Sequence, residues 1–193
     1  MNSNATENET AGIDRFPAAD PQAPQAVQAC RAEIAQRKGG LPGPYGLLVH
    51  SPQLAHAFEA LSGALWQGDV PRRVMEGLFL LNAWHHRCRY QWVRHVDKAR
   101  EAGLAQAVIE RLAAGAEPER GADPAFHAAW QLATVLQQAG AVSDALLAQL
   151  RLQFGTSKAI AELTAFCGFA SLVSNALRVR QPVLPADSGP APF

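Results

Sequence analysis

The sequence predicts an all-helical fold in a single domain of about eight helices. In most of the segments that Gly and Pro residues separate, apolar residues recur at helical spacing. We find no convincing strand, and the run Leu47-Leu48-Val49 is too short to count as one. The composition, 48% apolar and 18% charged residues in 193 positions, is typical of one globular domain.

Helix starts and stops can be placed in order along the chain. Ser51-Pro52, Asp123-Pro124, Ser143 and Thr156 are N-cap signals, and glycines or Pro182 end most segments. The segment from Gly39 to His50 contains two prolines and four glycines, so we expect a loop there without a helix. The expected helices span about residues 24–38, 52–67, 105–114, 124–139, 143–154 and 156–180, with a further helix that opens at Pro71 and a helical segment through Cys88 to Arg100 that stops at Gly103.

Both ends of the chain differ in composition from the middle. We expect disordered tails over residues 1–22 and 182–193, flanking a helical domain at 23–181. A weak internal similarity links Trp66-Gln67-Gly68-Asp69-Val70 to Gln138-Ala139-Gly140-Ala141-Val142. Each segment precedes a glutamate among apolar residues, Glu76 or Glu162. A duplicated helical hairpin would leave such a pattern, and so could chance.

Charge and composition argue against several classes of protein. A formal net charge of zero and a pI near 7 do not suit a nucleic-acid-binding protein. No apolar run approaches the roughly 20 residues that span a bilayer, and the N-terminus does not resemble a secretory signal. We therefore expect a cytoplasmic protein with no membrane partner. Cys30, Cys88 and Cys167 are widely spaced and include no C-x-x-C pair, which suits free thiols.

The most informative feature is a carboxylate inside the most apolar stretch of the chain. Glu76 lies in Val74-Met75-Glu76-Gly77-Leu78-Phe79-Leu80-Leu81, and a buried carboxylate needs a partner. Cys88, Gln91 or Trp92, and His95 follow on one helical face. On an unbroken helix Glu76 would lie about 18 Å from Cys88. The acid and the imidazole can therefore meet only if the chain bends, most plausibly around His85 to Arg87, although no Gly or Pro marks a bend there.

These residues resemble a known family. The pattern is similar to the carboxymuconolactone decarboxylase and alkylhydroperoxidase D superfamily over about Leu41 to Arg180. No single motif is specific, but the ordered set is. The residues that carry the resemblance are Glu76, the run Cys88-Arg89-Tyr90-Gln91-Trp92-Val93-Arg94-His95, Ala99, Gly103, the lead-in Gly43 to Leu54, and a last helix ending near Asn175. The resemblance implies an all-helical fold and a homo-oligomer, either a trimer or a hexamer.

The resemblance also implies two possible chemistries. In the hydroperoxidase branch a C-x-x-C pair cycles between dithiol and disulfide, but Gln91 stands where the second cysteine should be, and an amide cannot replace it. The decarboxylase branch needs no cofactor: a carboxylated unsaturated lactone loses carbon dioxide and a general acid protonates carbon. Glu76 and His95 match the residues that transfer protons, and His85 matches a position that is often His in that branch. An arginine could bind the substrate carboxylate, but the sequence does not say which.

Each candidate residue also has a structural interpretation. Glu76 could serve a helix end or an arginine, His95 could be a histidine of the helix face, and Cys88 could fill the core. Tyr90 and Trp92 are weak candidates for substrate contact and suit packing better. The basic cluster Arg87-Arg89-Arg94-Lys98-Arg100 is either a solvated helix face or a site for an anionic ligand. His85, His86 and His95 do not have a known zinc-ligand spacing, so we expect no metal.

The sequence thus favours a cofactor-independent lyase or isomerase acting on a small anionic lactone or acid. Glu76 and His95 would carry the proton, with His85 assisting. A thiol-dependent peroxidase using Cys88 and a non-catalytic helical oligomeric binding protein are the alternatives.

Overall fold

The computed structural model describes residues 15–16, 22–184, 186 and 188–193. Within these residues the chain forms nine helices and no strand, which confirms the predicted fold class. The helices are α1 (Gln25–Lys38), α2 (Tyr45–Leu48), α3 (Pro52–Trp66), α4 (Arg72–His85), α5 (Arg89–Glu101), α6 (Gln106–Ala113), α7 (Pro124–Gln137), α8 (Asp144–Phe154) and α9 (Ser157–Arg180). The predicted N-terminal tail lies almost wholly outside the described residues.

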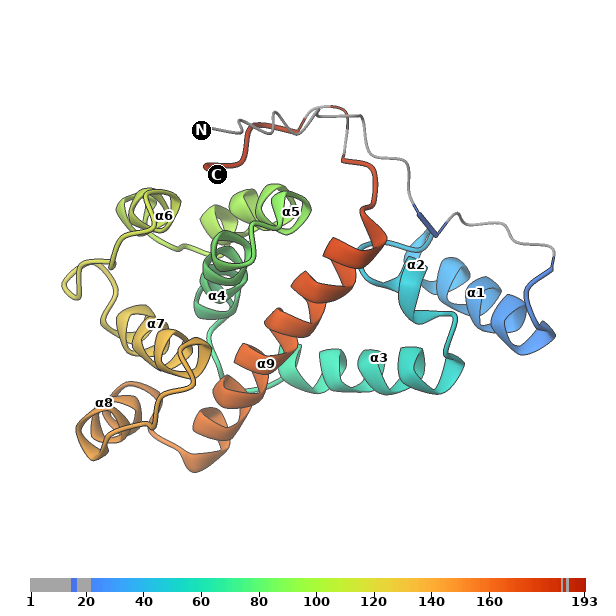
Figure 1. The fold of residues 1–193 in the computed structure, drawn as a ribbon. Coiled ribbons are helices and arrows are strands. Elements are labelled where there is room, and N and C mark those ends of the chain that lie inside the picture. Colours follow the sequence, from blue (N-terminus) through green and yellow to red (C-terminus); the bar gives the residue numbers. More distant parts are fainter. Residues whose placement is uncertain (1–14, 17–21, 185, 187) are drawn as a thin grey trace, which may run out of the picture.

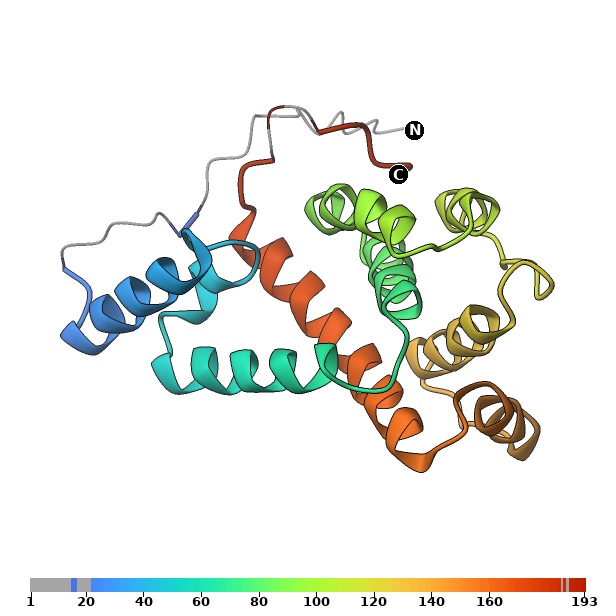
Figure 2. The same ribbon diagram turned by 180° about the vertical axis from the view of Figure 1, so that it is seen from behind.

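Helix α9 runs through the middle of the molecule. Figure 1 shows it as a long diagonal with α1, α2 and α3 on one side and α4 to α8 on the other, and Figure 2 shows the same division from behind. Among the described residues α9 alone is long and apolar enough to cross a membrane by length and composition. Half of its most apolar window is buried against the other helices, as in the core helix of a folded domain.

Three of the four predicted N-cap signals are confirmed by capping contacts. Asp123 accepts from the backbone N–H of Phe126 at 2.9 Å, and the Ser143 and Thr156 hydroxyls accept in the same way at the starts of α8 and α9. Such caps contribute about 1 kcal/mol each. Ser51 occupies the N-cap position of α3, but its side chain makes no capping bond. Proline at the first position of α3 therefore carries that signal.

The expectation of a helix-free loop from Gly39 to His50 was wrong. One helical turn, α2, forms over Tyr45–Leu48. All the breakers except Gly46 lie before this turn, and Pro44 supplies a φ of −74° and a carbonyl that accepts from the Leu48 N–H. Gly46, inside the turn, lies against the Arg180 guanidinium, and a Cβ there would come within 2.3 Å of it.

An aromatic cluster joins α3, α4 and α9. Phe58 stacks on Phe169 with ring centres 4.9 Å apart, and Phe79 meets Phe166 edge-on at 5.0 Å. Trp66 stacks on Phe79 at 6.0 Å. Burying such side chains stabilises the fold by roughly 1.5–3 kcal/mol each. All of these rings except that of Phe166 also line the cavity of the candidate site.

Candidate functional site

The chain bends sharply between α4 and α5, as the Glu76–His95 hypothesis requires. Helix α4 ends at His85, and Arg87 adopts a left-handed backbone with φ of 52°. The N–H of Cys88 then donates to the carbonyl of Ala83 at 2.8 Å and closes the turn. A non-glycine residue pays for this conformation in strain. The Arg87 guanidinium lies over the Trp84 ring at 4.7 Å, a cation–π contact that offsets part of that cost.

The bend brings Glu76 of α4 and His95 of α5 into direct contact. His95 Nδ1 lies 2.7 Å from Glu76 Oε2. The Glu76 side chain is only 2% exposed and that of His95 is 15% exposed. Arg72, one turn earlier on α4, places its Nε 3.6 Å from the other carboxylate oxygen. The expected partner of the buried carboxylate is thus an imidazole, supported by one exposed arginine.

The contacts of the His95 ring fix its orientation and its protonation. Phe79 stacks on it with ring centres 4.2 Å apart. Burial is the main influence on the ring and lowers the pKa of His95 below its ordinary value. Glu76 opposes that shift, while Lys98 and Arg94 add to it. At neutral pH the ring is therefore uncharged. A carboxylate can only accept, so Nδ1 carries the ring proton and Nε2 carries a lone pair.

Glu76 and His95 both line one cavity of about 540 Å³. Its walls come from α3, α4, α5, α9 and the segment 42–45. Four cationic side chains reach it: Lys38, Arg72, Arg94 and Lys98. Six aromatic side chains share the lining: Tyr45, Phe58, Trp66, Phe79, Tyr90 and Phe169. A larger cavity of about 710 Å³ lies on the other side of α5, against α6 and residues 188–192, and contains neither member of the pair. Apolar rings around a few converging polar groups are typical of small-molecule sites.

Comparisons with known proteins agree with this architecture. The sequence model of the carboxymuconolactone decarboxylase family matches residues 52–135, which include both Glu76 and His95. Over this segment, which is less than half of the chain, the sequence is similar to that family. No curated protein matches the sequence.

Three solved structures share the fold of this chain along nearly their whole length. A peroxidase-related protein from Silicibacter sp. TM1040 is 17% identical with a TM-score of 0.67, over 99% of this chain and 100% of the other. A peroxidase-related protein with an alkylhydroperoxidase AhpD core, from Ralstonia eutropha JMP134, is 20% identical with a TM-score of 0.68, over 92% and 95%. The debrominase Bmp8, in complex with 2,3,4-tribromopyrrole, is 14% identical with a TM-score of 0.63, over 95% and 96%. At these identities the likeness concerns the fold alone.

The other predicted site residues divide between this cavity and its surroundings. Tyr90 lines the cavity with the Glu76–His95 pair. His85 lines a separate cavity of about 330 Å³ with Trp84 and Trp130, so the structure does not bring it to the pair. Trp92 faces the other side of α5, where its ring meets that of Phe193 at 6.0 Å.

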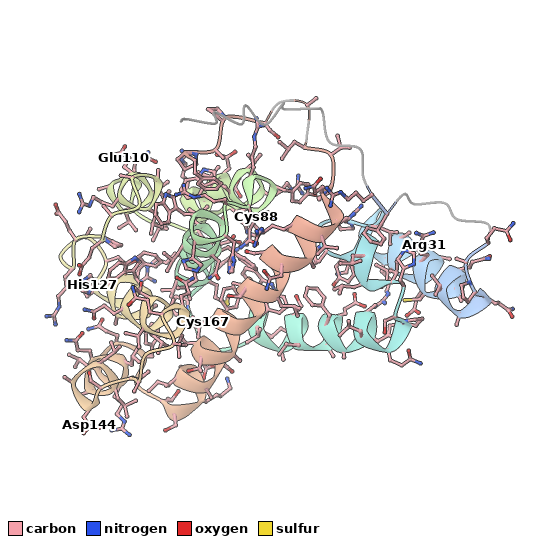
Figure 3. The ribbon with its side chains drawn as sticks, viewed as in Figure 1. Arg31, Cys88, Glu110, His127, Asp144 and Cys167 are labelled. Atoms are coloured by element: carbon pink, nitrogen blue, oxygen red, sulfur yellow. The ribbon has the colours of Figure 1, made fainter. Side chains whose placement is uncertain are left out.

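Cys88 lies at the N-cap of α5, in the core of the molecule (Figure 3). It is not one of the residues that line the cavity. Burial raises the pKa of the Cys88 thiol, and it raises the pKa of Cys167 to about 12. All three cysteines are free and buried. A protonated, enclosed thiol is a poor nucleophile, because the thiolate is the reactive form.

Gln91, at the position of the missing second cysteine, has a structural role instead. It is fully buried, and its amide donates to the carbonyl of Phe79 at 3.0 Å. The Ser174 hydroxyl donates to its carbonyl oxygen at 2.8 Å. These bonds hold α5 against both α4 and α9, and they position the helix that carries His95. The sequence offered no signal for the Ser174 partner, which lies 83 positions away.

No three His, Cys, Asp or Glu side chains converge to hold a metal ion among the residues that the structure describes. His85 and His86 have their ring centres 5.0 Å apart, while His95 lies in a different cavity.

Proposed function

We propose that this chain is a cofactor-independent enzyme in which the Glu76–His95 pair moves a proton on a small anionic lactone or carboxylic acid. The proposal rests on one observation, the 2.7 Å contact between a buried carboxylate and an imidazole that both line one cavity. The match of residues 52–135 to the carboxymuconolactone decarboxylase family is consistent with it. The reaction class is that of a lyase or isomerase.

The geometry supports His95 as a general base at neutral pH. Nε2 takes a proton from a carbon next to, or conjugated with, the substrate carbonyl, and the electron pair left behind moves toward the carbonyl oxygen. The imidazolium that forms stays hydrogen-bonded to Glu76, whose negative charge stabilises it. Returning the proton from Nε2 to a different carbon of the substrate completes an isomerisation. Every atom is accounted for, and no redox partner is needed.

Decarboxylation requires the same pair to donate a proton to carbon. The carbon–carboxylate bond breaks, carbon dioxide leaves, and the bonding electrons move toward the lactone carbonyl before carbon is protonated. The proton must come from a charged His95. Because Lys98 and Arg94 lower the pKa of His95, a bound anion that offsets their charge raises it again. Substrate binding itself would thus favour the acid form.

The debrominase structure supports the size and shape of the expected substrate. In that protein a fold similar to this one holds a small planar ring, 2,3,4-tribromopyrrole. The six aromatic side chains of this cavity suit a planar ring as well.

The test follows the proton directly. An unsaturated γ-lactone with an acetate side chain is incubated in D2O, and NMR records exchange of its carbon-bound hydrogens, migration of the double bond and loss of carbon dioxide. We expect at least one of these in the wild type and about a 100-fold loss in His95→Ala. Glu162→Gln is the control, since Glu162 binds the Asp69 N–H at 2.7 Å outside the cavity. Unchanged rates in both Glu76→Gln and His95→Ala would disprove the proposal.

The same preparations separate the other two functions. Peroxide consumption with dithiothreitol that is lost in Cys88→Ser would favour the thiol peroxidase. A metabolite screen that raises the melting temperature without any conversion would favour a binding protein.

A further inference from the structure

The four cations around the cavity are not equivalent. Arg72 lies beside the Glu76 carboxylate, and Lys38 pairs with Glu59 at 3.2 Å and lies over the Tyr45 ring. The side chains of Arg94 and Lys98, in contrast, have no ion-pair or hydrogen-bond partner among the residues that the structure describes. Within the described part of the chain, two positive charges at the cavity thus have no balancing negative charge in contact with them.

Arg94 and Lys98 also stand next to the reacting group. They lie one turn apart on α5, with His95 between them in sequence, and all three line the cavity. Both are close enough to lower the pKa of His95 through their charge. Arg94 is exposed and Lys98 is half-buried, so the two extend from the rim toward the interior.

The neighbouring cation on the same helix shows the contrast. Arg100 pairs with Asp97 at 2.6 Å and donates to Gln106 at 3.1 Å. It lines the larger cavity against α6 and is absent from the cavity of the pair. The basic cluster seen in the sequence therefore has two parts. Arg100 belongs to a solvated, ion-paired face, whereas Arg94 and Lys98 line the cavity of the Glu76–His95 pair.

We propose that Arg94 and Lys98 form the carboxylate-binding subsite of the cavity and select substrates that carry an anionic group close to the reacting carbon. The inference rests on the proposed function for the identity of the reacting group. Guanidinium and ammonium groups only donate, and a carboxylate only accepts, so both cations can bind one anion together. The planar remainder of the substrate then lies among the aromatic side chains, with His95 Nε2 beside the carbon that bears or adjoins the anionic group.

The test compares one acid with its neutral counterpart. The probes are the unsaturated γ-lactone with an acetate side chain and the methyl ester of the same molecule. Their dissociation constants are measured by titration calorimetry at low ionic strength, because exposed charges are screened by salt. The proteins are the wild type, Arg94→Gln, Lys98→Gln and the matched control Arg100→Gln, all checked for helical content.

The acid should bind the wild type more tightly than the ester does. We expect the dissociation constant of the acid to be about tenfold larger in Lys98→Gln than in the wild type. In Arg94→Gln it should be about threefold larger, because Arg94 is the more exposed of the two. The ester should bind all four proteins equally, and Arg100→Gln should match the wild type. Equal binding of acid and ester, no binding of the acid, or an equal loss in Arg100→Gln would each overturn the subsite.

A second readout locates the bound anion. Arg94 and Lys98 also border the larger cavity, so the acid could bind there instead. Binding beside the pair should shift the NMR signals of the His95 ring and raise its pKa, and binding on the other side of α5 should leave them unchanged and refute the proposal. Binding that depends on Lys98 without turnover would uphold the subsite and refute the proposed reaction. Turnover that is indifferent to both variants would do the reverse.

Discussion

Replacing Glu76 with glutamine should weaken proton transfer without unfolding the protein. The amide has the shape of the carboxylate but no charge, so it cannot stabilise a protonated imidazole or hold the ring proton on Nδ1 as firmly. A hydrogen bond to a charged group is worth about 1.5–3 kcal/mol, and this one is short and nearly fully buried. At about 1.4 kcal/mol per tenfold change in rate, we expect kcat/KM to fall by about 10- to 100-fold.

The ionisation of the imidazole provides a readout that needs no substrate. Glu76 is the group that raises the pKa of His95 against burial, so removing its charge should lower that pKa further. NMR titration of the His95 ring, assigned by comparison with His95→Gln, would measure the shift. Arg72 loses its partner in the same variant, but its side chain is 63% exposed, so that loss should cost little stability.

The control for Glu76→Gln makes the same substitution at a glutamate that lies outside the cavity. Glu162→Gln makes the same chemical change on α9, where Glu162 binds Asp69 and Lys158 at a distance from the cavity. It should change neither the His95 titration nor the rate. If Glu76→Gln left the ring pKa unchanged and kcat/KM within twofold of the wild type, the Glu76–His95 contact would have no part in the chemistry.

Three further outcomes follow from the same geometry. If the reaction is the isomerisation, the base form of His95 is the active one. Because burial lowers the pKa of His95, kcat/KM should then be flat near pH 7 and fall only at more acidic pH. The lowered pKa also makes this group's contribution to stability decline as pH falls from about 6.5, which urea denaturation at several pH values would measure. Dithiothreitol-dependent peroxide consumption should be negligible and equal in the wild type and Cys88→Ser, since burial keeps the thiol protonated; a rate that disappears in the variant would contradict this. Gly77→Ala should destabilise the fold by roughly 1–3 kcal/mol in thermal unfolding, because the new Cβ would lie 2.3 Å from the Phe126 ring, whereas Gly63→Ala, with open space around it, should not.

The fold could be predicted from the sequence because its signals are local. N-cap residues such as Asp123, Ser143 and Thr156 and the glycines after the helices act within a few positions of the boundaries that they set. The helix α2 was missed because its stability depends on distant residues, including the Arg180 guanidinium that packs against Gly46. Local breaker density carried no information about that contact.

The candidate site could be predicted only in part. Burial of Glu76 in an apolar run required a partner, and that argument pointed to a histidine ahead of it. The bend itself depends on Arg87, a residue type with no marked preference for a left-handed backbone. The sequence therefore predicted the position of the bend only from the requirement that Glu76 and His95 meet. Which side chains share the cavity is a long-range property. His85 and Trp92, close in sequence to His95, therefore line other spaces, while Lys38 and Phe169 line the same one.

The hydrogen bonds between Arg180 and the segment before α2 affect the order in which the site is assembled during folding. Arg180, at the last position of α9, donates to the carbonyls of Leu41 and Gly43, the former 139 positions earlier. That segment supplies Pro42, Gly43, Pro44 and Tyr45 to the cavity wall. The chain must therefore be translated through Arg180 before this wall of the cavity can be fixed, so the site forms only after long-range docking of α9.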